Sequence, residues 1–100
     1  MAFTQIIEAH TDDVGAVQRH VSAWHDSQHG VAPGYRQTRI LADADRPGTY
    51  LIEVEFSSEE EAKKNNERTE TKEWAQSVRQ LLTAEPIYRN LTEVCTTEGS

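Results

Sequence analysis

The chain has 100 residues, of which 17 are acidic and 10 are basic, and its formal net charge is −7. This length corresponds to one domain with a modest core. The acidic balance argues against nucleic-acid binding and against an anionic membrane surface, since both require clustered lysine and arginine.

The sequence also bears on location and on domain limits. No apolar run approaches the roughly 18 residues that cross a bilayer, and the N-terminus lacks the basic start and apolar stretch of a signal peptide. We therefore expect a cytoplasmic protein with one domain over residues 1–95 and a disordered polar tail over residues 96–100. Cys95 is the single cysteine, so an internal disulfide is excluded.

The first part of the chain predicts a strand and then a helix. Residues 2–10 form the strand, and its apolar face carries Phe3, Ile7 and Ala9. Thr11-Asp12-Asp13 supplies N-cap oxygens, and Gly30 is typical of a position just after a helix. Between them an apolar stripe has the spacing of one helix face: Val14, Val17, Val21 and Trp24.

A hairpin is expected next, with strands over residues 35–43 and 49–56 joined by a turn at Pro47-Gly48. The second of these strands alternates clearly. Its apolar positions are Tyr50, Ile52, Val54 and Phe56, and the opposite positions are Leu51, Glu53 and Glu55.

The last part predicts a helical segment broken in two, followed by a strand. Ser58 and Glu61 form a capping-box pattern that starts the first piece, which continues to about Asn65. The second piece carries an apolar stripe and is stopped by Pro86, and residues 87–95 form the closing strand. The stripe consists of Trp74, Val78, Leu81 and Leu82.

This order of elements predicts an α+β, ferredoxin-like βαββαβ fold with an antiparallel four-stranded sheet covered by helices on one face. The other face carries Glu53 and Glu55, and Leu51 with either Tyr35 or Ile40 would share it. A half-polar open sheet face is explained by packing against the same face of a second subunit. We therefore expect a homodimer.

Two tryptophans and one asparagine are candidates for ligand contacts. Trp74 and Trp24 are most simply core residues, and alternatively they form facing walls for a planar ligand. Asn65 and Asn66 are most simply helix-ending residues, because asparagine tolerates the left-handed conformation. Alternatively, Asn66 holds a hydroxyl or carbonyl group of a substrate.

Histidines and charged residues admit simpler explanations than a site. His20 is either a half-buried residue beside the apolar stripe or a general base. His25 and His29 have the i, i+4 spacing of a metal pair, but no third ligand has a recognisable spacing, so we expect no metal. Charged strand residues would form ion pairs across the sheet rather than a carboxylate site: Glu8, Glu53, Glu55, Arg39 and Arg89.

A family resemblance rests on the later part of the chain. The pattern consists of Tyr50-Leu-Ile-Glu-Val-Glu-Phe56, Ser58-x-Glu60-x-Ala62-x-x-x-Asn66, Trp74, Leu81-Leu82, Pro86 and a closing strand. It resembles small members of the antibiotic-biosynthesis-monooxygenase-like family, within the dimeric α+β barrel superfamily.

The resemblance implies a pocket between helices and sheet, commonly with an asparagine and a tryptophan, here Asn66 and Trp74. Some members oxygenate aromatic polyketides without metal or flavin, and others degrade haem. No histidine follows Trp74, so the haem-degrading arrangement is not reproduced. Trp74 also lies two residues later than the commonest spacing.

The expected function is that of a cofactor-independent monooxygenase acting on a planar aromatic or quinol-type metabolite. Asn66 and His20 are the candidate catalytic residues, and Trp24, Trp74 and Phe56 are the candidate substrate-binding residues. The alternative is a non-catalytic ligand-binding or structural homodimer, and a third option is isomerase or cyclase chemistry with His20 as base. An open cavity with an inward polar group would favour an enzyme, whereas a closed core would favour a structural role.

Overall fold

The structure is a computed structural model that describes residues 2–99. Met1, the first residue of the predicted domain, and Ser100, the last residue of the predicted tail, lie outside the described residues. The elements follow in the predicted order: β1 (Phe3–His10), α1 (Val14–Gln28), β2 (Tyr35–Ala42), β3 (Thr49–Phe56), α2 (Glu59–Asn66), α3 (Thr69–Arg79) and β4 (Ile87–Thr92). Residues 93–99 have no helix or strand. The last strand stops at Thr92, short of the predicted Cys95, because Thr92 pairs with Phe3, where β1 begins.

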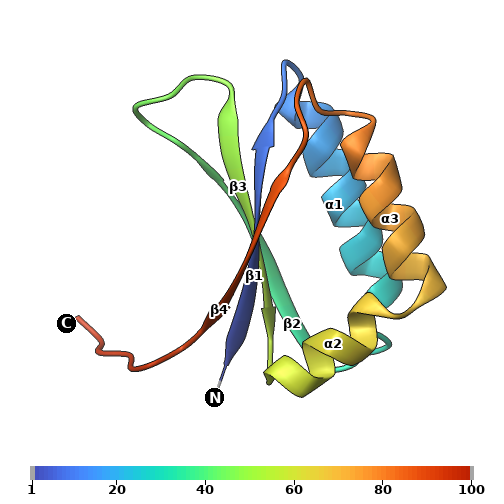
Figure 1. Cartoon of the computed structure of the whole chain (residues 1–100), viewed down its shortest axis with the longest axis vertical. Coiled ribbons are helices and arrows are strands. Elements are labelled where there is room, and N and C mark those ends of the chain that lie inside the picture. Colours follow the sequence, from blue (N-terminus) through green and yellow to red (C-terminus); the bar gives the residue numbers. More distant parts are fainter. Residues whose placement is uncertain (1, 100) are drawn as a thin grey trace.

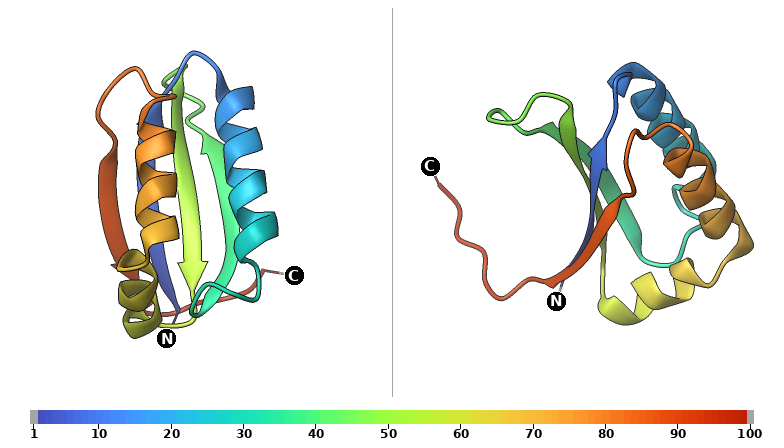
Figure 2. Two further views of the ribbon diagram at one scale, coloured as in Figure 1. Left: turned by 90° about the vertical axis from the view of Figure 1, so that its right-hand side faces the viewer. Right: turned by 45° about the horizontal axis from the view of Figure 1, so that its top comes forward.

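The four strands form one antiparallel sheet in the order β2-β3-β1-β4. The helices lie on one face of this sheet, with α1 and α3 side by side and α2 near the end of the layer where the chain begins (Figures 1 and 2). This arrangement confirms the predicted ferredoxin-like α+β fold.

The core lies between the helices and the inner face of the sheet. Ile52 and Phe56 on β3 are fully buried, and so is Ala62 on α2. The predicted apolar stripe of α1 supplies Val17, Val21 and Trp24. The alternation in the sequence therefore identified correctly which face of β3 packs against the helices.

A bulge in β2 changes which of its residues face inward. The pairing with β3 shifts between Tyr35 and Gln37, so that Arg36 is the extra residue. Tyr35 then pairs with Phe56 and Ile40 with Ile52, which places both side chains on the core side. The expectation that one of them shares the outer face with Leu51 is wrong; Leu41, which pairs with Leu51, lies there instead.

The helix starts follow the capping signals of the sequence. The carboxylate of Asp13 accepts a hydrogen bond of 3.1 Å from the Ala16 amide, and the Ser58 hydroxyl accepts one of 3.2 Å from the Glu61 amide. Gly30 has φ of 83°, in the left-handed region expected after a helix.

The left-handed conformation expected for Asn65 and Asn66 is wrong, although Asn66 does end α2. Both lie inside α2, and among residues 2–99 only glycines have positive φ. Glu67 caps the helix in right-handed helical conformation, and its amide donates a hydrogen bond to the Lys64 carbonyl at 3.3 Å. The two asparagines are therefore presented on helical turns, where consecutive residues point in different directions.

The predicted stripe of α3 extends further than the helix. The helix ends at Arg79, so Leu81 and Leu82 follow it, although both still pack against the core. The Thr11 hydroxyl donates to the Leu81 carbonyl at 2.9 Å, and the Thr83 amide donates to the His10 carbonyl at 2.8 Å. These bonds hold the chain at the end of β1 and prevent the helix from continuing.

Within residues 2–99, no helix lies over the outer face of the sheet (Figure 1). Its charged residues form ion pairs between neighbouring strands: Arg39 with Glu53 at 2.6 Å, Arg89 with Glu8 at 3.1 Å and Arg36 with Glu55 at 3.9 Å. The predicted ion pairing is thus present.

None of the helices within residues 2–99 combines the length and the apolar character that crossing a membrane requires.

Candidate functional site

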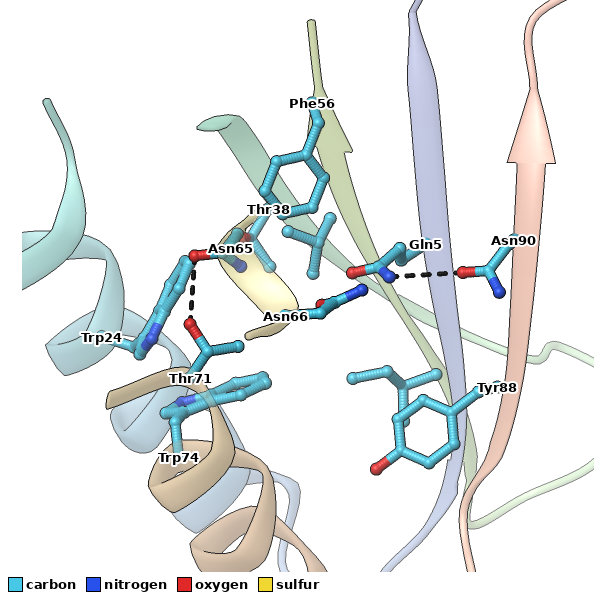
Figure 3. Close-up of a pocket in the computed structure, with 12 residues that line it drawn as sticks. Gln5, Trp24, Thr38, Phe56, Asn65, Asn66, Thr71, Trp74, Tyr88 and Asn90 are labelled. Atoms are coloured by element: carbon cyan, nitrogen blue, oxygen red, sulfur yellow. Dashed lines mark hydrogen bonds between the residues drawn. The ribbon is translucent and has the colours of Figure 1, made fainter. Parts of the chain in front are cut away.

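A cavity of about 300 Å³ lies between the helices and the inner face of the sheet (Figure 3). Each of the seven helices and strands contributes to its lining, which consists of Gln5, Ile7, Trp24, Thr38, Val54, Phe56, Asn65, Asn66, Thr71, Trp74, Tyr88 and Asn90. The volume is at the lower end of the range for small-molecule sites. The core is therefore open at this place rather than filled by its own side chains.

Aromatic side chains from four elements form the apolar walls. Trp24 on α1 and Trp74 on α3 have ring centroids 5.5 Å apart, tilted by 44°. Phe56 on β3 is fully buried behind the cavity, and Tyr88 on β4 is half exposed. The structure thus brings together the three residues predicted to bind substrate, and it adds Tyr88.

Asn65 is the buried polar group of the cavity, with only 2% of its surface exposed. Its Oδ1 accepts hydrogen bonds from the Thr71 hydroxyl at 3.0 Å and from the Arg68 guanidinium at 3.3 Å. Because a guanidinium can only donate, the amide atom facing it must be the oxygen. This contact fixes the orientation of the amide, and its NH₂ group remains as a donor beside the cavity (Figure 3).

Asn66, the predicted catalytic asparagine, also lines the cavity, but its side chain is exposed. It is the last residue of α2 and extends into the space between the helices and the strands (Figure 3). Nearby, Gln5 on β1 donates to Asn90 on β4 at 3.3 Å. The polar part of the cavity is therefore made of neutral amides and hydroxyls, without a charged side chain.

His20, the predicted base, is not among the residues that line the cavity. Its ring stacks on Trp74, with centroids 6.0 Å apart and planes 9° apart, and its carbonyl accepts a hydrogen bond of 3.4 Å from the Trp74 indole. The Nε2 atom is buried and has no hydrogen-bond partner within residues 2–99. His20 thus supports the position of Trp74, and the structure does not bring it to the site where a base would act.

His25, which has the i, i+4 spacing of a metal pair with His29, is half-buried and hydrogen-bonded. Its Nδ1 lies 2.6 Å from the Tyr35 hydroxyl, which lies 2.8 Å from the Thr38 hydroxyl. The ring of His29 is 5.1 Å away. Within residues 2–99, no three histidine, cysteine or acidic side chains come together as metal ligands.

Several lining residues were not identified from the sequence: Gln5, Thr38, Asn65, Thr71, Tyr88 and Asn90. Strand alternation carried a signal for Gln5, which lies between Phe3 and Ile7 on the face predicted to be buried. A glutamine among core positions is unusual enough to indicate a polar pocket. No comparable signal marks Thr71, because its role depends on where Asn65 lies.

The comparisons with known proteins concern the fold. No family model matches the chain, and no curated protein sequence matches it. Three similar solved structures are a candidate antibiotic biosynthesis monooxygenase from Nitrosomonas europaea, Rv0793 from Mycobacterium tuberculosis and SnoaB, a cofactor-independent oxygenase from Streptomyces nogalater.

These similarities extend over nearly the whole length of each chain. The Nitrosomonas protein has a TM-score of 0.75 at 17% identity, covering 97% of this chain and 94% of its own. Rv0793 has a TM-score of 0.75 at 15% identity, covering 98% and 100%. SnoaB has a TM-score of 0.73 at 16% identity, covering 95% of each chain. The chain thus has the fold of the antibiotic-biosynthesis-monooxygenase-like proteins, as the sequence pattern predicted.

Proposed function

We propose that the protein is a cofactor-independent monooxygenase that oxidises a planar phenolic or quinol-type metabolite. The observation that carries this proposal is the cavity, in which aromatic walls stand beside the fixed amide donor of Asn65. Trp24, Trp74 and Phe56 would contact the faces and edges of the ring system. The volume of about 300 Å³ suits about two or three fused rings.

The chemistry needs no group beyond the substrate and oxygen. A phenol with a free para position and O₂ give a para-quinone and water. One oxygen atom is bonded to the para carbon, the other becomes water, and the substrate supplies all four electrons. The reactive form is the phenolate, whose electron density is the source of the first electron. A site for this reaction must therefore stabilise an oxyanion.

Asn65 and Asn66 provide amide donors for that oxyanion. Asn65 is held by Thr71 and Arg68, so its NH₂ group need not reorganise when charge develops on the substrate. Asn66 is exposed at the edge of the cavity and would complete the hydrogen bonding once a ligand covers it. Both are neutral, which suits the binding of a phenol before it ionises.

The fold comparison supports the proposal, since SnoaB combines the same fold with cofactor-independent oxygenase activity. The test is oxygen uptake by the purified protein with a panel of planar phenols and hydroquinones, in the presence of a metal chelator. We expect uptake with at least one member, with one oxygenated quinone and no hydrogen peroxide formed for each O₂ consumed. Binding without uptake would instead support a ligand-binding role, and neither binding nor uptake would overturn the proposal.

We also propose that the protein is a homodimer formed through the outer faces of the two sheets. Apolar side chains lie on that uncovered face between the ion pairs, with Leu41 37%, Ile87 47% and Leu91 45% exposed. A second copy of the same face would cover them, and self-complementary packing of this kind is the common solution for small domains. Sedimentation at micromolar concentration should show the dimer mass; a monomer would contradict the proposal.

A further inference from the structure

A chain of hydrogen bonds leads from the cavity to the protein surface. It begins at Thr38 on β2, which lines the cavity (Figure 3). The Thr38 hydroxyl lies 2.8 Å from the Tyr35 hydroxyl, and the Tyr35 hydroxyl lies 2.6 Å from Nδ1 of His25 on α1. His25 in turn lines a shallow groove on the surface, which Thr38 also borders. The three side chains thus connect the site to solvent by two short bonds.

The middle of this chain is shielded from water. Tyr35 is only 8% exposed, and its ring packs edge-on against Trp24 at 4.9 Å and against Phe56 at 6.2 Å. Burial raises the pKa of the Tyr35 hydroxyl, so it remains protonated and can accept a proton on one side while donating one on the other.

Each end of this chain of hydrogen bonds has the chemistry that its position requires. A threonine hydroxyl both accepts and donates, so it can take a proton from a ligand hydroxyl. Histidine is the side chain that exchanges protons readily near neutral pH. The titratable groups beside His25 include Asp26 on its own helix, His29 just after that helix and Tyr35 on β2.

We propose that Thr38, Tyr35 and His25 form a proton relay that takes the phenolic proton of the substrate from the cavity to solvent. The inference rests on the proposed function, since cofactor-independent oxidation of a phenol requires the phenolate. It assigns the role of proton acceptor, predicted for His20, to a different histidine on the same helix.

The steps balance as proton transfers without oxidation or reduction. The substrate O–H bond breaks and its proton passes to the Thr38 oxygen, whose own proton passes to Tyr35. The Tyr35 proton passes to Nδ1 of His25, and Nε2 of the resulting imidazolium releases a proton to water. The substrate is left as a phenolate beside the Asn65 amide, and rotation of the two hydroxyls and exchange of the imidazole tautomer reset the relay.

A photoacid tests the relay independently of oxygenation. The probe is 2-naphthol, which becomes a much stronger acid on excitation and emits differently as naphthol and as naphtholate. Its binding is measured by quenching of the two tryptophans of the chain, both of which line the cavity. Excitation beyond the tryptophan band then reports whether the bound probe loses its proton before it emits.

We expect bound 2-naphthol to emit mainly as naphtholate in the unaltered protein. Thr38→Val, Tyr35→Phe and His25→Asn each keep the approximate shape of the side chain while interrupting proton transfer, so naphthol emission should dominate in all three. With a phenolic substrate, turnover should fall by roughly 10²-fold, as for loss of a general base. Added imidazole should restore part of the turnover of His25→Ala, because His25 lies at the surface groove.

His29→Asn is the matched control, since His29 is exposed, follows the end of α1 four residues after His25, and makes no hydrogen bond to Tyr35 within residues 2–99. It should leave the emission unchanged. Unchanged naphtholate emission in all three relay variants, with 2-naphthol still bound, would overturn the relay and leave the proposed function standing. Failure of 2-naphthol to quench the tryptophans of the unaltered protein would instead count against the aromatic site itself.

Discussion

The two faces of the sheet both carry polar side chains, but they use them differently. On the outer face the polar groups are charged, and each carboxylate named above has an arginine partner on a neighbouring strand. On the inner face the polar groups around the cavity are neutral, and the Asn65 amide keeps a donor free after its bonds to Thr71 and Arg68. The charged groups of the outer face are thus bonded to one another, whereas the polar groups around the cavity leave a hydrogen-bond donor for a ligand.

This difference shows that charge alone is a poor indicator of a site in this protein. The glutamates and arginines of the strands are its most conspicuous polar residues, yet their interactions are with each other. A site requires polar groups whose hydrogen-bonding capacity is incomplete in the folded chain and that lie in a space of suitable shape. Here those groups are amides and hydroxyls next to tryptophan.

The largest effect should come from the packed part of the inner face. Phe56→Ala should lower the free energy of unfolding by about 3–5 kcal/mol, because the ring is fully buried and a cavity would remain. Tyr88→Ala is the matched control at the opposite side of the same cavity, where the ring is 54% exposed, and it should cost much less. Equal losses of unfolding free energy for the two variants, measured by urea unfolding, would contradict this difference between the buried and the exposed wall.

The next largest effect concerns the donor of Asn65. Asn65→Asp keeps an oxygen for Thr71 and Arg68 but replaces the NH₂ donor with a second acceptor. Oxygen uptake with a phenolic substrate should fall by about 10²–10³-fold, as for loss of one oxyanion donor. Uptake equal to that of the unaltered protein would remove Asn65 from the mechanism.

Acid should reduce the stability that the ion pair of Glu8 and Arg89 on the outer face contributes. The hydrogen bond from Arg89 lowers the pKa of Glu8 below its usual value of 4.5. A lowered folded-state pKa gives stability that is fully present above the usual glutamate value and is lost as the pH falls through the lowered one. The free energy of unfolding should therefore decrease as the pH falls below the usual value, and Glu8→Gln should reduce that decrease. An identical pH dependence in both proteins would contradict a role for this pair.

The smallest effect should come from a more exposed pair on the same face. Arg39→Met removes the partner of Glu53, and because the arginine side chain is 60% exposed, the loss should be under about 1 kcal/mol in the dilute protein. A loss that grows with protein concentration would support burial of this face between subunits. A loss above about 2 kcal/mol at high dilution would show that the outer face stabilises the single subunit more than its exposure suggests.

The element order and the buried face of β3 could be predicted because they depend on local periodicity and capping. The side chains of β2 could not be assigned, because the bulge at Arg36 reverses the alternation between Tyr35 and Ile40. Nothing in the local composition marks that bulge. The end of α3 was also missed, because bonds from the distant Thr11 and His10 decide it.

The candidate site was predicted in its aromatic part and only approximately in its polar part. Trp24, Trp74 and Phe56 lie on apolar stripes, so the packing of helices on the sheet brings them together. Asn65 and Asn66 differ by one position, and successive helix residues point about 100° apart, so only the rotation of α2 decides which one is buried. The rotation of α1 about its own axis likewise directs His20 against Trp74 and His25 toward Tyr35.

The central claim is that the cavity between helices and sheet binds a planar phenol. The most direct measurement is a titration of the ¹⁵N-labelled protein with 2-naphthol, followed by two-dimensional NMR. The account predicts that the indole signals of Trp24 and Trp74 and the side-chain NH₂ signals of Asn65 move together and saturate. Shifts confined to the outer strands, or no saturable shifts at these three side chains, would contradict it.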